Sequence, residues 1–267
     1  MRIDKDLTNA EYRQANGLSA SDIKNILANP YLFKIGYKPE RTAQAQARLD
    51  LGSAIHCLIL ESHHFERDFA IMPELNLRTK EGKESRAKLL ANEKRIIISQ
   101  KDYDLAKEIA QLVLDTNLYD FSAGLCEASI FSELEGVKVK CRPDCFWQDK
   151  GVIVDIKTTR NGGNTPDEFQ KQVANFGYYI QASFYMQITG AKEFFFLAVD
   201  IDTKTIGIYE LDFVSLEFGL SEIRRAIDIY KNINNISNIV SKDFVNETFS
   251  RVLTLPNYVF YKNGVNL

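Results

Sequence analysis

Two carboxylates and a lysine mark the end of a predicted β-hairpin. Asp144 lies in VKVKCRPDCFW (137–147), and Asp155 and Lys157 lie in GVIVDIKTTR (151–160). Side chains alternate between the two faces of a strand, so Ile153, Asp155 and Lys157 should share one face. The intervening QDKG (148–151) has the Asp and Gly content of a tight turn. The sequence therefore predicts that 137–147 and 151–160 are two alternating strands that pair as a hairpin.

The register of this hairpin brings two acids together. If Trp147 lies opposite Val152, then Asp144 lies opposite Asp155. Opposed residues have Cβ atoms roughly 4.5–5.5 Å apart, and like charges there repel. One explanation is a structural salt bridge in which Lys157 neutralises the pair. The other is a divalent cation, because carboxylate oxygens suit Mg²⁺. Burying like charges without a metal would raise one pKa and reduce stability, so the register favours the metal.

Composition limits the class of protein. The chain has 267 residues, of which 45% are hydrophobic, enough for a substantial core. No apolar run is long enough to span a membrane, and residues 1–14 lack the apolar core of a secretory signal. We therefore expect a cytoplasmic protein with no membrane contact. The net charge of −3 gives no overall attraction to nucleic acid, so any DNA contact must come from local clusters of Lys and Arg.

The predicted elements change from helices to strands along the chain. Helices are predicted over 18–30, where Ser19 or Ser21 can cap and Pro30 ends the pattern, over 47–61, and over 101–116. Residues 76–95 are charge-rich and open with a loop-like segment. Strands are predicted over 127–134, 193–200 and 205–212, and helices over 167–190 and 216–233.

This order predicts an α/β or α+β fold in a single domain over residues 1–267. Its parts are a helical N-terminal layer (1–125), a sheet core that carries the catalytic residues (126–215), and a C-terminal helix and tail (216–267).

A known family has a similar layout. Asp144, then ten residues, then Asp155, Ile156 and Lys157 is the layout of the PD-(D/E)xK nuclease core, with the Pro present as RPD (142–144). The segments LGSAIHCLILE, EASIF, CRPD, VDIKTT and YYIQASFY occur in the order, and at about the spacing, of the RecE-type exodeoxyribonuclease VIII family, relatives of lambda exonuclease. The sequence resembles that family from about Leu18 to LTLP (253–256).

The resemblance implies a restriction-endonuclease-like core, with a central mixed sheet flanked by helices. The chain departs from the family near its end, at Asn257 and Tyr258, where the family often has a Trp.

The resemblance also implies roles for individual residues. Asp144 and Asp155 would bind the metal, the Ile156 carbonyl would offer a further oxygen, and Lys157 would be the catalytic lysine. A lysine two residues from the acid can orient the attacking water or stabilise the oxyanion. Four more residues would complete the site, the first of them as a further metal ligand: His56, Glu127, Gln181 and Tyr185.

Each of these residues also has a structural explanation. His56 could be a core histidine, Gln181 and Tyr185 could be packing residues on an aromatic helix, and Glu127 could be a solvated surface acid. The Lys and Arg residues of 78–95 either form a solvated face or contact DNA. The two serines of the first helix either cap it or hold a terminal phosphate.

The function that the resemblance implies is a metal-dependent exodeoxyribonuclease. It would use Mg²⁺, or Mn²⁺ as a substitute, and degrade linear double-stranded DNA from 5′ to 3′, leaving 3′ single strands for recombination. The expected partners are DNA ends, further copies of the chain in a ring, with a tetramer favoured, and a single-strand annealing recombinase. The absence of GxxxxGK[ST] argues against ATP.

Two alternatives remain open at this stage, and a third is disfavoured. The chain could be a DNA-binding or assembly module that has lost catalysis, or an endonuclease that uses the same site. The iron–sulfur nucleases of the superfamily carry three cysteines after the core, whereas no Cys follows Cys145 here, so no iron–sulfur cluster is expected.

Overall fold

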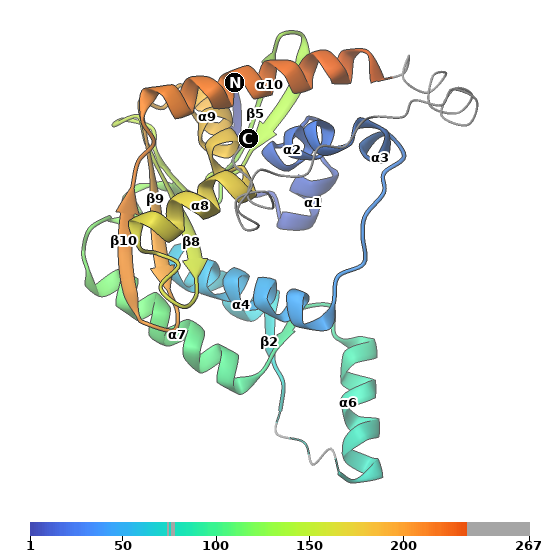
Figure 1. Cartoon of the computed structure of the whole chain (residues 1–267). Coiled ribbons are helices and arrows are strands. Elements are labelled where there is room, and N and C mark those ends of the chain that lie inside the picture. Colours follow the sequence, from blue (N-terminus) through green and yellow to red (C-terminus); the bar gives the residue numbers. More distant parts are fainter. Residues whose placement is uncertain (74, 76–77, 234–267) are drawn as a thin grey trace, which may run out of the picture.

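A five-stranded sheet forms the centre of the protein (Figure 1). The computed structural model describes residues 1–73, 75 and 78–233. The sheet order is β10-β9-β8-β7-β4, with the bounds Thr205–Tyr209, Glu193–Asp200, Val152–Thr159, Cys145–Trp147 and Leu125–Cys126. β8 and β9 run parallel, and the other neighbouring strands run antiparallel. The central sheet is therefore mixed, as expected.

Two smaller sheets flank it. β1 (Arg2–Asp4), β5 (Ser129–Leu134) and β6 (Val137–Cys141) form an antiparallel sheet in the order β1-β5-β6. β2 (Phe69–Ile71) and β3 (Ile96–Ile98) pair in parallel. The strand at the start of the chain thus pairs with β5, which begins at Ser129.

Helices cover both faces of the central sheet (Figure 1). On one face, α2 (Ala20–Ala28), α9 (Tyr178–Thr189) and α10 (Phe213–Lys231) contribute to one hydrophobic cluster with the sheet. On the other face, α4 (Ala43–Leu60) and α7 (Gln100–Asp115) form a second cluster. The sequence predicted one N-terminal helical layer, but α2 and α4 lie on opposite faces because each has its own apolar face to bury.

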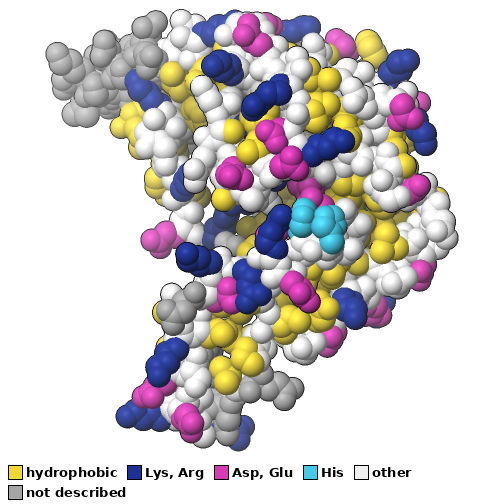
Figure 2. Space-filling view, turned by 180° about the vertical axis from the view of Figure 1, so that it is seen from behind, with side chains coloured by type: hydrophobic (Ala, Val, Ile, Leu, Met, Phe, Trp, Pro, Cys, Tyr) yellow, Lys and Arg dark blue, Asp and Glu magenta, His cyan; other side chains and the backbone are white. Residues whose placement is uncertain are grey.

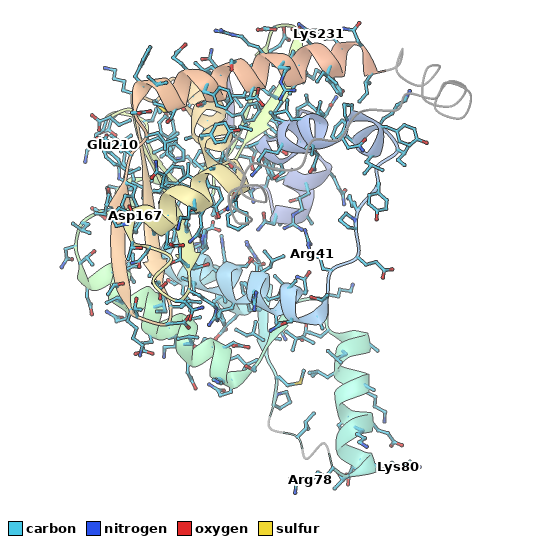
Figure 3. All side chains as sticks on the ribbon, viewed as in Figure 1. Arg41, Arg78, Lys80, Asp167, Glu210 and Lys231 are labelled. Atoms are coloured by element: carbon cyan, nitrogen blue, oxygen red, sulfur yellow. The ribbon has the colours of Figure 1, made fainter. Side chains whose placement is uncertain are left out.

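The remaining helices are α1 (Asn9–Gln14), α3 (Pro30–Lys34), α5 (Phe65–Asp68), α6 (Lys80–Asn92) and α8 (Pro166–Phe176), with 3₁₀ turns at Ser62–His64 and Phe121–Ala123. α6 extends away from the rest of the molecule in Figure 1. Figure 3 shows Arg78 and Lys80 at the far end of this arm. Most of the charge-rich segment 76–95 is therefore helical, and Thr79 caps α6 by accepting the Gly82 N–H.

Local sequence explains where α2 begins. The Ser19 hydroxyl accepts the Asp22 N–H, and the Asp22 carboxylate accepts the Ser19 N–H at 2.8 Å, which is a capping box. Ile23 and Ile26, three residues apart on one helix face, are fully buried. Of the two predicted caps, Ser19 is the one used. Pro30, predicted to end the helix, also begins α3.

The predicted hairpin is confirmed at its turn and wrong beyond it. Trp147 pairs with Val152 and Cys145 with Val154, which is the predicted register. The run 137–147 is not one strand, however: β6 ends at Cys141 in one sheet, and β7 begins at Cys145 in another. Pro143 lies in the break and has no N–H for a ladder. Asp144 therefore stands just before β7 rather than within a continuous strand.

The segment 167–190 was predicted as one helix and forms two. Gly177, with φ +61° and ψ 41°, adopts the left-handed conformation that ends α8, and α9 begins at Tyr178. The strands predicted over 193–200 and 205–212 are β9 and β10. The similarity at 253–256 and the departure at 257–258 lie outside the described residues. Within the described part of the chain, no helix combines the length and apolar character needed to cross a membrane.

One buried carboxylate joins the ends of β8 and β9. Asp200 is fully buried. Its oxygens accept hydrogen bonds from the Thr159 hydroxyl, the N–H groups of Gly162, Gly163, Asp202 and Thr203, and the Thr203 hydroxyl. Burial opposes its charge, but these hydrogen bonds lower the pKa of Asp200 overall. The ionised carboxylate therefore fixes the loop that follows β8.

Replacing Asp200 by Asn should lower the free energy of unfolding by about 2 kcal/mol at pH 7, because the amide nitrogen cannot accept these hydrogen bonds. Since the folded pKa is lowered, this stabilisation is fully present above the unfolded pKa of about 3.9 and is lost as the pH falls from there through the folded pKa. Urea unfolding from pH 7 down to pH ~2.5 tests this, with the exposed Asp149→Asn as control. Equal stabilities at pH 7, or a difference that stays constant in acid, would contradict the prediction.

Candidate active site

Three side chains from β8 and α9 form a connected network at the sheet. The Lys157 ammonium forms an ion pair with Asp155 and donates to Gln181 Oε1 at 3.2 Å. Gln181 Nε2 donates to Asp155 Oδ1 at 2.7 Å. Asp155 is only 1% exposed, so its charge depends on these neighbours. Gln181 holds the carboxylate and the ammonium in fixed positions relative to each other.

An aromatic ring covers the lysine. The Lys157 Nζ lies 4.6 Å from the centroid of the Tyr178 ring, in a cation–π contact. Burial lowers the pKa of Lys157, but the charges of Asp155 and Asp144 outweigh burial and raise it overall. The site therefore keeps this lysine protonated. Sequence reasoning missed Tyr178, although it precedes Gln181 by three residues and so shares its helix face.

Asp144 contacts β8 from the break between β6 and β7. Its Oδ2 accepts the Ile156 N–H at 2.6 Å and lies 3.3 Å from His56 Nδ1. The N–H and C=O of one strand residue point to the same strand edge, so the Ile156 carbonyl also faces the Asp144 side. Burial raises the pKa of Asp144, but His56 and the Ile156 N–H lower it overall. Asp144 is therefore held as an ionised carboxylate.

Glu127 joins this group through an unusual backbone conformation. It follows β4 with φ +49°, a left-handed conformation that is rare for a residue other than Gly, Asn or Asp. Its N–H donates to the Asp144 carbonyl at 3.0 Å. One ligand atom each of His56, Glu127 and Asp144 can be chosen so that all lie within 4.8 Å of one another. Glu127 was predicted as the first residue of the strand 127–134. It lies instead in a turn, which directs its carboxyl group toward Asp144.

The site has more negative than positive charge. Burial, followed by the charge of Asp144, raises the pKa of Glu127. Burial also raises the pKa of Asp155, with Asp144 adding to it and Lys157 opposing it. Burial is the largest cause of both rises, so these carboxyl groups need nearby positive charge to stay ionised. A cation would supply that charge.

The donor set fits a divalent metal. His56, Glu127 and Asp144 offer one nitrogen and carboxylate oxygens around one point. Asp155 Oδ2 is buried and accepts no well-oriented hydrogen bond from the described residues, although the Lys157 ammonium contacts it. Of the predicted metal ligands, His56 and Asp144 belong to the group that could hold a cation. The third member of that group is Glu127, which was predicted as a site residue but not as a metal ligand.

Tyr185 is half-buried and lies one helical turn from Gln181 on α9. Its ring packs against the hydrophobic cluster, with its centroid 6.3 Å from that of Phe194. Burial raises the pKa of Tyr185 well above its usual value, and the charges of Asp155 and Asp144 add to this rise. Tyr185 therefore packs in the core and also lies within the electrostatic influence of the two acids.

A small charged cavity lies beside Glu127. It has a volume of about 120 Å³ and is lined by Lys5, Asp6, Leu7, Thr8, Asn9, Glu61, His64, Arg67, Asp68, Glu127 and Arg142. Figure 2 shows Lys, Arg, Asp and Glu side chains gathered around the histidines on this face. Arg142, of the RPD motif, donates to the Ser129 hydroxyl at 2.7 Å, which fixes the start of the break before Asp144.

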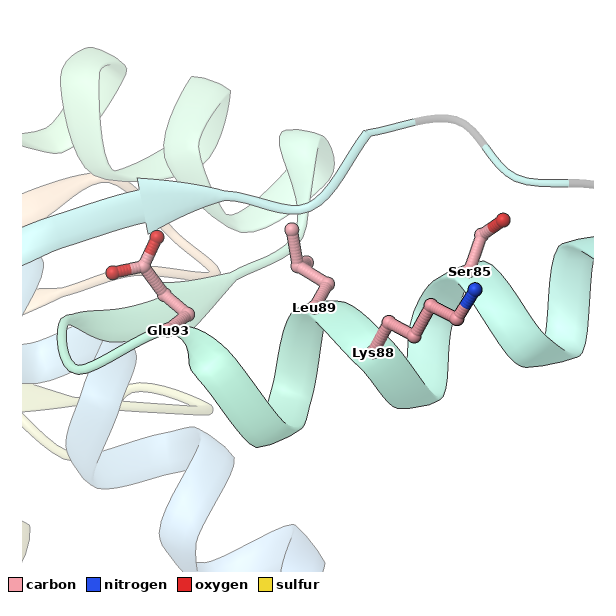
Figure 4. A pocket seen from close by; sticks show the side chains of 4 residues that line it. All are labelled: Ser85, Lys88, Leu89 and Glu93. Carbon is pink, nitrogen blue, oxygen red and sulfur yellow. The ribbon is translucent and has the colours of Figure 1, made fainter.

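A larger cavity of about 480 Å³ lies along α6 and is lined by Ser85, Lys88, Leu89 and Glu93 (Figure 4). None of these lining residues is a predicted site residue, so this cavity is separate from the Asp155 network.

Comparison with known proteins identifies the family. A model described as "PDDEXK-like domain of unknown function (DUF3799)" matches residues 19–239. The chain belongs to this family. The sequence contains the letters of this description as Pro143 and Asp144, followed by Asp155, Ile156 and Lys157. A comparison with curated proteins gave no match.

One solved structure supports the same fold. The chain is similar to a "Putative exonuclease" from Eubacterium rectale, with 18% identity, a TM-score of 0.59, and coverage of 97% of this chain and 98% of that one. An alkaline exonuclease from Laribacter hongkongensis (13% identity, TM-score 0.33) matches over 88% of this chain and 99% of its own. A phage related exonuclease from Haemophilus somnus 129PT (14% identity, TM-score 0.36) matches over 85% and 99%. Only the first is close enough to carry an argument, and it supports the fold alone.

Adding Mg²⁺ or Mn²⁺ should stabilise the protein, by about 2.7 kcal/mol at a metal concentration one hundred times Kd. Thermal unfolding with and without metal measures this shift. Asp144→Asn and Glu127→Gln should lose it, because each removes a ligand oxygen and its negative charge. Asp149→Asn, in the exposed turn after β7, should keep it. Full metal-dependent stabilisation of Asp144→Asn would contradict the assignment of the metal site.

Proposed function

We propose that this chain is a metal-dependent nuclease that hydrolyses phosphodiester bonds of DNA. The observation that carries the proposal is the network of Asp155, Lys157 and Gln181 beside Asp144 on a PDDEXK-like core. The acids Asp144, Asp155 and Glu127, together with His56, would provide metal ligands. Lys157 provides a positive charge for a phosphate. A catalytically inactive module would not need the buried acids and the lysine to remain together.

Each residue has a defined part in this mechanism. His56, Glu127, Asp144, Asp155 and the Ile156 carbonyl would hold Mg²⁺, with Mn²⁺ as a substitute. When bound, the cation would offset the negative charge that builds on the phosphoryl oxygens.

The protein itself supplies orientation and charge. The Lys157 ammonium lies at the same site and can orient the attacking water or stabilise the phosphoryl oxyanion. Gln181 and the Tyr178 ring keep that ammonium in place. The ion pair with Asp155 favours the protonated form of Lys157, which can then act as a positive charge beside the phosphate.

We further propose that the substrate is the end of linear double-stranded DNA and that the 5′-terminated strand is degraded. The polarity rests on the resemblance to the RecE-type family. The products would be 3′ single strands for a single-strand annealing recombinase, and the reaction would use neither ATP nor an iron–sulfur cluster. An endonuclease built on the same site is the second candidate, because the chemistry at Asp155 and Lys157 does not by itself require an end.

A ring of several copies, with a tetramer favoured, would explain how an acidic chain holds DNA. Assembly can gather scattered basic residues around a channel and leave the acidic surface outside. An exposed apolar patch at the start of α10 supports assembly: Phe213, Val214 and Phe218 are 75%, 72% and 56% exposed. Patches of this kind are commonly covered by another subunit.

The end requirement predicts that linear duplex is degraded in Mg²⁺ at low salt while the same DNA as a covalently closed circle is not, because a closed circle cannot enter a channel. Release of a 5′ label before a 3′ label tests the polarity.

Lys157→Met and Asp155→Asn should lower the rate of DNA cleavage by at least ~10²-fold, whereas Asp149→Asn should leave it unchanged. Equal rates on circular and linear DNA would favour the endonuclease, and wild-type activity in Asp155→Asn would place the chemistry elsewhere.

Light scattering should give a mass that is a multiple of the 30.5 kDa of one chain, with four copies favoured. Phe213→Glu with Phe218→Glu should weaken the assembly, because charge would replace the apolar patch. Leu114→Glu, which alters an exposed leucine on α7, is the matched control. A monomer under DNA-bound, active conditions would contradict the ring.

A further inference from the structure

A second lysine reaches the active site from the N-terminal helices. Lys24 lies on α2, which begins at the Ser19–Asp22 capping box and buries Ile23 and Ile26. Its Nζ donates to the carbonyl of Phe176, the last residue of α8, at 3.1 Å. No carboxylate of the described residues forms an ion pair with it. The Lys24 ammonium thus has one neutral acceptor on a group that can donate three hydrogen bonds.

The backbone at the junction of α8 and α9 leaves room for this side chain. A Cβ built on Gly177 would lie 2.9 Å from Lys24 Cδ, closer than such atoms approach in proteins. The stem of Lys24 therefore runs across Gly177. The next residue, Tyr178, is the ring that contacts the Lys157 ammonium. Lys24 of α2 therefore contacts Gly177, and Lys157 of β8 contacts the neighbouring residue Tyr178.

The positive charge of Lys24 is poorly balanced there. Burial lowers the pKa of Lys24, repulsion by Lys157 lowers it further, and Asp155 opposes both. A lysine that only capped α8 would need no charge, since a neutral donor could serve the Phe176 carbonyl. An anion near both lysines would offset their repulsion.

We propose that Lys24 binds a backbone phosphate of the DNA strand, next to the phosphate that is cut, and so positions that strand over Lys157. The inference rests on the proposed nuclease function and adds a residue to its substrate site. An ammonium binds phosphate as a point charge, without reading the base. Lys24 is a positioning residue, and α2 would then contribute directly to DNA binding.

The test is steady-state cleavage of linear duplex in Mg²⁺ by three variants. Lys24→Met keeps the stem over Gly177 and removes the charge, Lys24→Gln keeps a neutral donor for the Phe176 carbonyl, and Lys24→Arg keeps the charge. We expect KM to rise about tenfold in Lys24→Met and Lys24→Gln with little change in kcat, and to stay near wild type in Lys24→Arg. The slope of log(kcat/KM) against log[salt] should become less steep by about 0.9 in the first two variants.

Lys34→Met is the matched control, because Lys34 also donates to a backbone carbonyl, that of Ile233, at 3.3 Å. Thermal unfolding identifies any variant that is merely destabilised. A wild-type KM and salt slope in Lys24→Gln would show that Lys24 only caps α8 and would overturn the inference, as would unchanged values in Lys24→Met. Wild-type protein that does not cut duplex DNA would overturn the nuclease proposal, and this inference with it.

Discussion

The burial of an ionised carboxylate on β8 is the constraint on which the site depends. Asp155 is 1% exposed, and an unpaired charge at such a depth would be strongly destabilising. Lys157 pairs with it from two residues along the same strand, and Gln181 hydrogen-bonds to both from α9. Asp155 can therefore stay ionised on β8 only while α9 packs against that face of the sheet. The hydrophobic cluster that positions α9 thus also positions the Asp155–Lys157–Gln181 network.

The turn at Gly177 connects this constraint to the rest of the fold. A continuous helix over 167–190 would not allow the change of direction that lets α9 present Tyr178 and Gln181 to Lys157. The left-handed conformation at Gly177 makes that change, and its missing side chain leaves the space that Lys24 occupies. Gly177 thus allows α8 and α9 to pack in different directions, and it leaves room for Lys24 of α2 beside the site.

The second half of the site is organised by an interruption of a strand. The chain leaves one sheet at Cys141 and enters the next at Cys145, and the residues between them are free of ladder pairing. Asp144 uses this freedom to accept the Ile156 N–H, and its backbone carbonyl accepts the N–H of Glu127. The resulting group of acids has raised pKa values at Glu127 and Asp155, which is the electrostatic signature of a site that a cation would complete.

The sequence by itself determined local features: a serine cap for α2 at Ser19 or Ser21, a strand at 193–200, most of the strand predicted over 205–212, the pairing of Trp147 with Val152, and the alternation that puts Asp155 and Lys157 on one face. These depend on period-2 and period-3.6 patterns and on turn residues, which act over a few positions. Only the tertiary structure decided that β6 and β7 belong to different sheets, that α2 and α4 lie on opposite faces, and that Lys24 crosses Gly177. Contacts such as that of His56 with Asp144, and of Lys24 with Phe176, join segments far apart in the chain, and no local pattern specifies them because they arise from how whole elements pack.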